Sequence, residues 1–210
     1  MRSALLFDED HPGSPRVRAA RNGREVAGVS GARRRRVRAG ARDRFALSAS
    51  RVEAVLFDRD KTLIVDVPFN GDPDLVRAAP GARAQLDRLR AAGLPLAVVS
   101  NQSGVGRGLL TLEQVEAVNR RVDELLGPFA GFFICPHAPD DACDCRKPKP
   151  KLILDAARSL GVEPRYCVVV GDRESDVEAA RNAGAIPLKV AGAHALADAV
   201  DRVLALSERR

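Results

Sequence analysis

Two aspartates, Asp58 and Asp60, stand one residue apart directly after a short apolar run over residues 52–57 that is rich in β-forming residues. Side chains alternate along an extended segment, so the two carboxylates point to the same side. Two negative charges at such a short distance are unfavourable unless a cation or a shared proton compensates them. Because Mg²⁺ is bound through one or two carboxylates together with substrate phosphate, the pair predicts a metal site for phosphate chemistry. The alternative is a strand followed by an acidic turn, and residues further along the chain decide between the two.

Polar side chains also follow the later apolar runs of the chain or precede its helices. They are Ser100, Asn101, Gln102, Arg146, Lys147, Asp172 and Asp176. In an open α/β sheet, ligands bind in the crevice beyond the carboxyl ends of the strands, so these groups would share one site. Phosphoryl transfer through a covalent intermediate needs a carboxylate nucleophile, a second carboxyl group to move protons and cations that neutralise the phosphate oxygens. The set supplies each of these.

The elements that must position these groups alternate between strands and helices. Apolar runs predict strands over 52–57, 94–99, 131–135, 166–170 and 186–190. Apolar residues at helical spacing predict helices that contain 82–89, 115–125, 153–160, 177–180 and 196–204. Thr111 and Gln114 form a capping-box pattern before the second helix. The alternation predicts one doubly wound α/β domain with a mostly parallel sheet over residues 51–210.

The positive charge of the chain is concentrated in its first 50 residues. The chain has 210 residues and a net charge of +6, and residues 1–50 hold 12 Arg against 5 acidic residues, a balance of +7 that leaves −1 for the rest. This segment has no sustained apolar period, so we expect an Arg-rich, disordered extension. It is either without function or the product of a start codon assigned too early. A basic arm that contacts nucleic acid is the alternative, but the segment lacks interleaved aromatic residues and a recognisable binding module, so nucleic acid is not an expected partner.

No apolar run approaches the roughly 18 residues that a membrane-spanning helix needs. The apolar run over residues 4–7 is too short for the core of a signal peptide. We therefore expect a cytoplasmic protein with no membrane partner, which acts as a monomer.

Four motifs in order resemble those of the haloacid dehalogenase superfamily of aspartate-nucleophile phosphatases, whose fold is of the Rossmann type. The motifs lie at residues 58–62, 100–104, 146–148 and 171–176. The resemblance implies that Asp58 attacks phosphorus and that Asp60 acts first as an acid and then as a base. It implies that Ser100 and Lys147 hold the phosphate. It further implies that Asp58, the backbone carbonyl of Asp60, and Asp172 bind Mg²⁺.

One position departs from this resemblance, because Lys61 stands where the superfamily often has glycine. A lysine lacks the conformational freedom of glycine and adds a charge beside the site. We expect Lys61 to change the local geometry without removing any reacting group.

A dense cluster of metal-binding side chains lies at residues 135–145. The pattern C-x-H-x₅-C-x-C is formed by Cys135, His137, Cys143 and Cys145. Three cysteines and one histidine suit a closed tetrahedral zinc site, and disulfides are not expected where thiols stay reduced. The alternative is a surface histidine with incidental cysteines. Because the cluster runs directly into residues 146–147, zinc would fix the side chains that grip phosphate.

With this zinc loop, the chain resembles the subfamily IIIA phosphatases that act on D-glycero-D-manno-heptose 1,7-bisphosphate, at its 7-phosphate, and on histidinol phosphate. The resemblance implies a set of substrate contacts from Asp66, Val67, Pro68, Phe69, Asn101, Gln102, Ser103, Arg146 and Arg173. The intervals between the motifs are filled by the predicted helices and strands, so we expect an open site without a large cap domain.

We expect a small phosphorylated metabolite as the substrate, with the heptose bisphosphate first. A histidinol-phosphate or general sugar-phosphate phosphatase is the nearest alternative, and a phosphatase of nucleic-acid 3′ ends is more remote. A signalling module that keeps its aspartyl phosphate is disfavoured, because Asp60 would hydrolyse that intermediate.

Removal of residues 1–50 should change neither the melting temperature nor the turnover, because this segment has no apolar face to pack on the domain. Thermal unfolding and phosphate release of the full and shortened chains measure both quantities. A large loss of stability would show that the segment packs on the domain. A selective loss of activity on 3′-phosphorylated DNA would favour the nucleic-acid alternative.

Overall fold

In the computed structural model the described residues are 52–192 and 195–208, so the predicted extension over residues 1–50 lies outside them. The described residues form one sheet of five parallel strands in the order β3-β2-β1-β4-β5. The strands are β1 Ala54–Phe57, β2 Leu96–Asn101, β3 Phe132–Cys135, β4 Cys167–Gly171 and β5 Ile186–Lys189. The parallel α/β sheet predicted from the sequence is confirmed.

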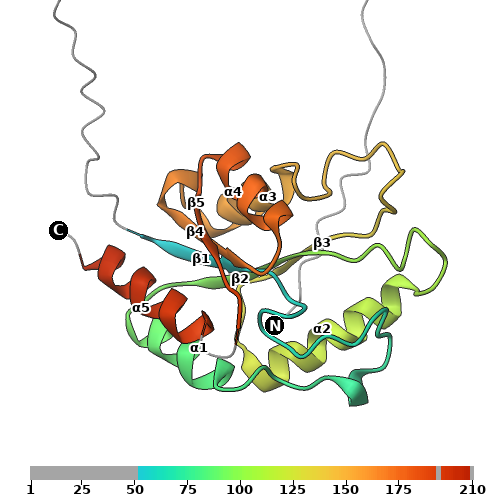
Figure 1. Cartoon of the computed structure of the whole chain (residues 1–210), viewed down its shortest axis with the longest axis horizontal. Helices are drawn as coiled ribbons and strands as arrows, with labels where there is room; N and C mark the ends of the chain where they lie inside the picture. Colours follow the sequence, from blue (N-terminus) through green and yellow to red (C-terminus); the bar gives the residue numbers. More distant parts are fainter. Residues whose placement is uncertain (1–51, 193–194, 209–210) are drawn as a thin grey trace, which may run out of the picture. The chain divides into compact units, whose positions relative to one another are not determined.

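Helices cover both faces of the sheet (Figure 1). The described residues contain the α-helices α1 Ala82–Ala91, α2 Leu112–Leu126, α3 Lys151–Leu160, α4 Glu174–Ala183 and α5 Ala195–Ser207, and the short 3₁₀ helices η1 Pro73–Leu75 and η2 Pro164–Tyr166. Side chains of α1, α2 and α5 pack on one face, and those of α3 and α4 pack on the other. The arrangement is the doubly wound one that right-handed βαβ connections produce.

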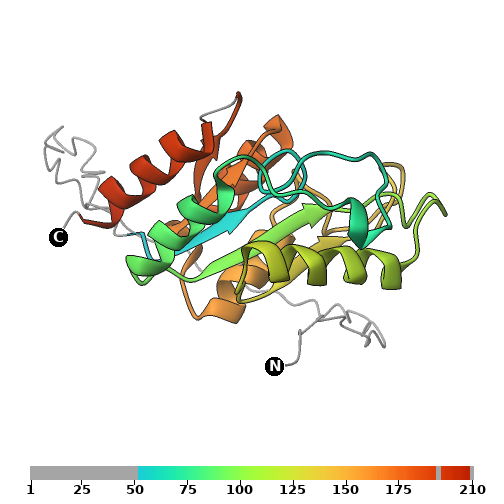
Figure 2. The same ribbon diagram turned by 90° about the horizontal axis from the view of Figure 1, so that it is seen from below.

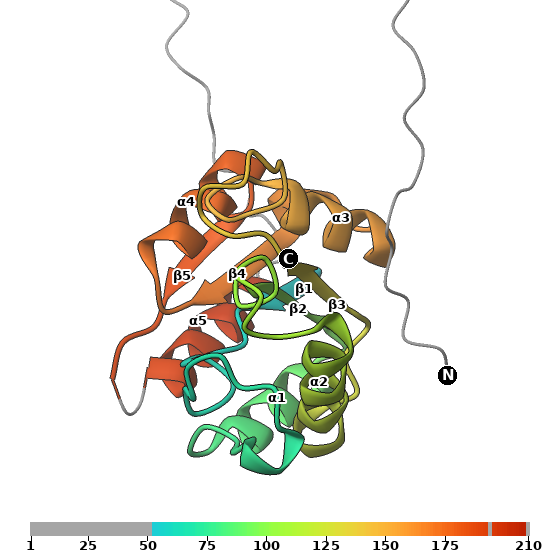
Figure 3. The same cartoon turned by 90° about the vertical axis from the view of Figure 1, so that its right-hand side faces the viewer.

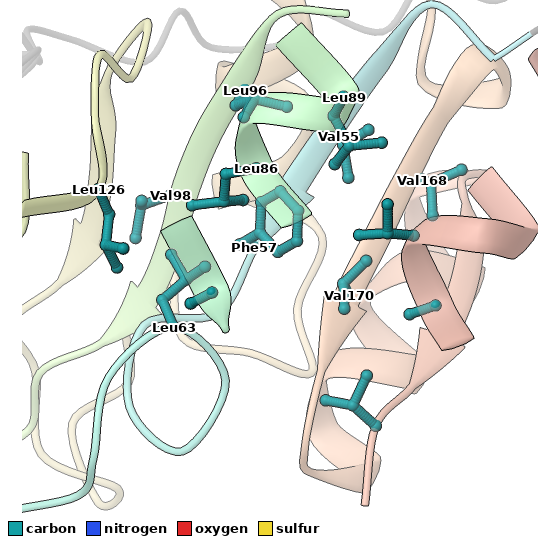
Figure 4. Close-up of a cluster of buried hydrophobic side chains, with 14 of the residues drawn as sticks. Val55, Phe57, Leu63, Leu86, Leu89, Leu96, Val98, Leu126, Val168 and Val170 are labelled. Carbon is teal, nitrogen blue, oxygen red and sulfur yellow. The ribbon is translucent and has the colours of Figure 1, made fainter. Parts of the chain in front are cut away.

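The central strand β1 is buried on both faces. Val55 and Phe57 point into the core beneath α1, where they lie near Leu86 and Leu89 (Figure 4). The alternate side chains of β1 belong to the core beneath α3 and α4. Since both faces of a parallel sheet are covered, its strands are continuous apolar runs, which is why these segments were recognisable in the sequence.

The strand β2 ends two residues later than predicted. Ser100 and Asn101, which were expected to follow the strand, pair with Ile134 and Cys135 of β3. The partner strand therefore holds the backbone of both polar residues in a fixed register. The predicted capping box of α2 is confirmed, since the Thr111 hydroxyl accepts from the backbone N–H of Gln114 and the Gln114 side chain accepts from that of Thr111.

The connections at the ends of the strands are loops, with no separate cap domain among the described residues (Figure 2). Across the same residues, no helix combines the length and the apolar character needed to cross a membrane.

The carboxyl end of β4 packs closely against the first turn of α4. Asp176 is buried, and its Oδ2 accepts from the backbone N–H of Arg173 at 3.0 Å. A Cβ atom at Gly171 would overlap the Asp176 carboxylate. Glycine is therefore needed here for close approach, because it leaves room for a buried acid beside the strand.

Replacement of Gly171 by alanine should lower the free energy of unfolding by about 1–3 kcal/mol, as overpacked sites typically do. It should also lower turnover, because Asp176 must move. Denaturant unfolding measures the first effect. Gly131→Ala is the matched control, since a Cβ there would meet the ring of Phe133 at 3.1 Å, a side chain that can yield. Equal losses in both variants would contradict the close-approach argument.

Candidate active site

A cavity of about 440 Å³ opens at the end of the sheet toward which the strands run, which faces the viewer in Figure 3. The structure brings most of the predicted site residues to its wall, namely Asp58, Asp60, Asp66, Val67, Pro68, Phe69, Ser100, Asn101, Gln102, Ser103, Arg146, Lys147 and Arg173. The lining also includes Asp176, which was expected in the shared crevice, and residues with no predicted role, namely Arg59, Asn70, Gly104, Arg107 and Ser175. The loops after β1, β2 and β4 and the loop before α3 thus share one site.

The Lys147 ammonium lies at the base of this site, with only 2% of its side chain exposed. Its Nζ is 2.8 Å from Asp58 Oδ1 and 2.6 Å from Asp176 Oδ1, and it donates to the backbone carbonyl of Val99 at 2.7 Å. All three ammonium hydrogens have an acceptor. Burial by itself lowers the pKa of a lysine, but the two carboxylates outweigh it and raise the pKa of Lys147. Lys147 is therefore charged and fixed beside Asp58.

The Asp58 carboxylate is held in an environment that opposes its ionisation. Burial raises its pKa, and although Lys147 acts against this, the negative charges of Asp176 and Asp60 add to the rise. One ammonium, that of Lys147, therefore faces two buried carboxylates, those of Asp58 and Asp176. The excess of negative charge favours the binding of a further cation.

A third carboxylate completes a candidate site for that cation. Oxygen atoms of Asp58, Asp172 and Asp176 all lie within 4.8 Å of one another. Asp172 Oδ1 is buried without a hydrogen-bond partner, and burial, followed by repulsion from Asp176, raises the pKa of Asp172. Three carboxylates and the Lys147 ammonium leave a local charge of −2, which a divalent ion would neutralise. The donor set of hard oxygen atoms fits such an ion.

The side chain of Asp60 lies apart from these three carboxylates. Its Oδ2 accepts from Gln102 Nε2 at 2.9 Å and from Arg59 Nη2 at 3.1 Å. About a third of the side chain, 29%, is exposed, and it faces the cavity. The third carboxylate of the cluster comes from Asp176, for which no metal role was predicted. Any contribution of Asp60 to a metal through its backbone carbonyl stays a prediction.

Ser100 and Asn101 at the end of β2, and Gln102 directly after it, have different partners. Ser100 Oγ accepts from Gln102 Nε2 at 3.0 Å. The Asn101 side chain, which was expected at the substrate, uses both of its polar groups on the backbone of Lys147, at 3.0 and 3.1 Å. Asn101 thus positions Lys147, and Gln102 connects Ser100 to Asp60.

Lys61 adopts the left-handed conformation that glycine prefers, with φ of 61°. This conformation costs a non-glycine residue about 1–2 kcal/mol. Its Nζ lies 3.3 Å from Asp66 Oδ2, so the side chain contacts the loop of the predicted substrate residues 66–69. The backbone at Lys61 therefore has the conformation that a glycine would adopt here, although the residue carries a long side chain.

Several arginines supply positive charge around the cavity. Arg146 and Arg173 line it as predicted. Arg107, which the sequence did not suggest, lies over the ring of Phe69 with its guanidinium carbon 5.9 Å from the ring centre. A second anionic or polar group of a phosphorylated ligand would meet these side chains.

The predicted zinc ligands come together at the end of β3, which contributes Cys135, and on the loop before α3, which contributes His137, Cys143 and Cys145. The Sγ of Cys135 is 3.6 Å from His137 Nδ1 and 3.8 Å from Cys143 Sγ, and His137 Nδ1 is 3.2 Å from Cys145 Sγ. Two sulfurs bound to one tetrahedral zinc at about 2.3 Å lie about 3.8 Å apart. The cluster therefore fits zinc in both its donor set and its spacing.

Comparison with known proteins gives consistent matches. The sequence profile of the haloacid dehalogenase-like hydrolases matches residues 9–184. A Bordetella bronchiseptica protein named D-glycero-beta-D-manno-heptose-1,7-bisphosphate 7-phosphatase is 35% identical over 141 residues, which cover 65% of this chain and 79% of the relative. A Pseudomonas aeruginosa protein of the same name is 40% identical over 115 residues, which cover 53% of this chain and 65% of the relative.

A solved structure agrees with these matches. The crystal structure of D,D-heptose 1,7-bisphosphate phosphatase from B. bronchiseptica, complexed with magnesium and phosphate, superposes with a TM-score of 0.66. It is 30% identical and covers 73% of this chain and 99% of its own. The matched profile, the relatives and the site together show that the chain belongs to the haloacid dehalogenase-like hydrolases and is a phosphatase.

Proposed function

We propose that this phosphatase is Mg²⁺-dependent and removes the 7-phosphate of D-glycero-D-manno-heptose 1,7-bisphosphate through an aspartyl-phosphate intermediate. The names of the relatives support the substrate. The observation that carries the mechanism is the pairing of the buried Asp58 with the Lys147 ammonium at 2.8 Å, beside a separately held Asp60.

In the first step, a carboxylate oxygen of Asp58 forms a bond to phosphorus as the bond from phosphorus to the sugar oxygen breaks. Asp60 gives its proton to that oxygen, so the leaving group departs as an alcohol. Asp60 then takes a proton from water, whose oxygen attacks phosphorus and releases inorganic phosphate from Asp58. Lys147 and the Ser100 hydroxyl stabilise the equatorial phosphate oxygens during both steps.

The carboxylates of Asp58, Asp172 and Asp176 would hold Mg²⁺, because their oxygens converge and carry the charge that a divalent ion balances. When bound, the ion draws the phosphate toward Asp58 and neutralises charge on its oxygens. Lys147 contacts Asp58 directly, so its positive charge opposes the effect of burial on this carboxylate.

The cysteine and histidine cluster would hold zinc as a structural ion, because four protein ligands leave no open position for water. Its loop leads directly into Arg146 and Lys147. The Arg146 guanidinium donates to the backbone carbonyl of His137 at 3.4 Å, which connects this side chain to the cluster. Bound at this cluster, zinc would order the residues that face the phosphate without entering the reaction.

Replacement of Asp58 by asparagine should abolish phosphate release from the heptose bisphosphate, because an amide of the same shape cannot act as the nucleophile. Steady-state phosphate release measures the effect, and the melting temperature reports that the fold is kept. Asp201→Asn is the matched control, since this side chain on α5 is 61% exposed and far along the chain from the site. Full activity of the purified Asp58→Asn protein would contradict the mechanism.

The substrate is tested with the same assay on a panel. Phosphate release from the two anomers of the heptose bisphosphate is compared with release from histidinol phosphate and from 3′-phosphorylated oligonucleotides. We expect the highest kcat/KM on one heptose anomer. A higher value on histidinol phosphate or on oligonucleotides would replace the proposed substrate but keep the reaction.

The two metals should respond differently to chelation. Brief treatment with a mild chelator should stop turnover, and Mg²⁺ alone should restore it, because such ions keep several waters and few protein ligands. Zinc should remain at one equivalent in elemental analysis of the same sample.

Replacement of Cys143 by serine should lower the zinc content and the melting temperature, and should raise KM because the loop that carries Arg146 loosens. Cys167→Ala is the control, because this buried cysteine lies in β4, outside the cluster. Protein purified under reducing conditions without chelator that lacks zinc yet keeps normal activity would contradict the structural role.

A further inference from the structure

We propose that Arg59 and Asn119 are positioning residues that aim the Asp60 carboxyl at the leaving-group oxygen. The proposal rests on the phosphatase mechanism above but on no particular substrate. It concerns a buried hydrogen-bond network that leads from the middle of α2 to the edge of the cavity.

The Arg59 guanidinium contacts both oxygens of Asp60. Its Nε donates to Oδ1 at 3.2 Å and its Nη2 donates to Oδ2 at 3.1 Å. Two parallel contacts between a guanidinium and a carboxylate fix the plane of the carboxylate as well as its position. Only 3% of the Arg59 side chain is exposed, so this geometry is enclosed by protein.

Two of the three remaining donors of Arg59 are also engaged. Its Nη1 donates to Asn119 Oδ1 at 2.8 Å, and its Nη2 donates to Gln102 Oε1 at 2.8 Å. A guanidinium used in this way has little left with which to bind a substrate phosphate. Its contacts instead indicate that it aligns the side chains of Asp60 and Gln102.

Asn119 is the anchor of the network. It lies on the buried face of α2, which is otherwise lined by Val115, Val118, Val122 and Leu126, and it is 5% exposed. A buried amide is unfavourable unless it is hydrogen-bonded, and its bond to Arg59 joins residues 60 positions apart in the chain. A helix that packs on the sheet thereby fixes the guanidinium from the side opposite Asp60.

The network has a chemical consequence that depends on the leaving group. A sugar oxygen departs as a poor leaving group and needs the proton of Asp60, whereas p-nitrophenolate departs without one. Misalignment of Asp60 should therefore slow the first step for a sugar phosphate much more than for p-nitrophenyl phosphate. Because kcat/KM reports the steps up to the first irreversible one, the shared hydrolysis of the aspartyl phosphate does not enter this comparison.

The test is Asn119→Leu, which keeps the approximate shape but removes the acceptor for Arg59. We expect kcat/KM on the sugar phosphate of highest activity in the panel to fall by about tenfold, a part of the roughly 10²–10⁴-fold that general acid–base catalysis supplies. On p-nitrophenyl phosphate it should fall by less than about threefold, a loss well short of that contribution. Asn119→Asp retains an acceptor and should keep the wild-type ratio of the two values.

Val118→Ala is the control for stability, because it removes apolar contacts from the same face of α2 without touching the network. It should lower the melting temperature and leave the ratio unchanged. An equal loss on both substrates in Asn119→Leu, or the same change of ratio in Val118→Ala, would overturn the positioning role. If the wild-type protein releases no phosphate from any ester, the proposed function itself has failed.

Discussion

The Lys147 ammonium, buried between Asp58 and Asp176, is the interaction on which the rest of the site depends. Removing one partner of a buried ion pair typically costs about 3–5 kcal/mol, because the remaining charge is left without compensation. Other features of the fold serve this contact. Asn101 holds the backbone of Lys147, and Gly171 leaves room for Asp176. Residues at the carboxyl ends of β1, β2 and β4 thus all help to hold the buried Lys147 ammonium.

The two reacting aspartates have different cation partners. Asp58 is buried and pairs with Lys147, whereas Asp60 pairs with Arg59 at the edge of the cavity. Carboxyl groups only two positions apart in the sequence therefore have distinct electrostatic surroundings. In the mechanism we propose, such a division would let Asp58 attack while Asp60 transfers protons.

Much of the fold could be predicted because its causes are local. The apolar runs of buried parallel strands, the capping box at Thr111 and the glycines after the helices all leave patterns within a few residues. The residues of the cavity could be predicted because motifs follow the strands. The end of β2 could not, since its last two residues are ordered by pairing with β3. The partners of Arg59 and Lys147 could not either, because Asn119 and Asp176 lie far along the chain from them. A polar residue on an otherwise apolar face of a predicted helix was the one local sign of Asn119.

The two cation pairs are also separated along the chain, and this matters during synthesis. Arg59, Asp60, Ser100, Gln102 and Asn119 all precede β3, whereas Lys147 is 89 residues from Asp58 and Asp176 follows later still. Translation proceeds from the N-terminus, and β1 needs β4 as its second neighbour in the sheet. The residues that contact Asp60 are therefore synthesised before Lys147 and Asp176, which lie beside Asp58. The contacts of Lys147 with both Asp58 and Asp176 can be complete only after α4 has been synthesised.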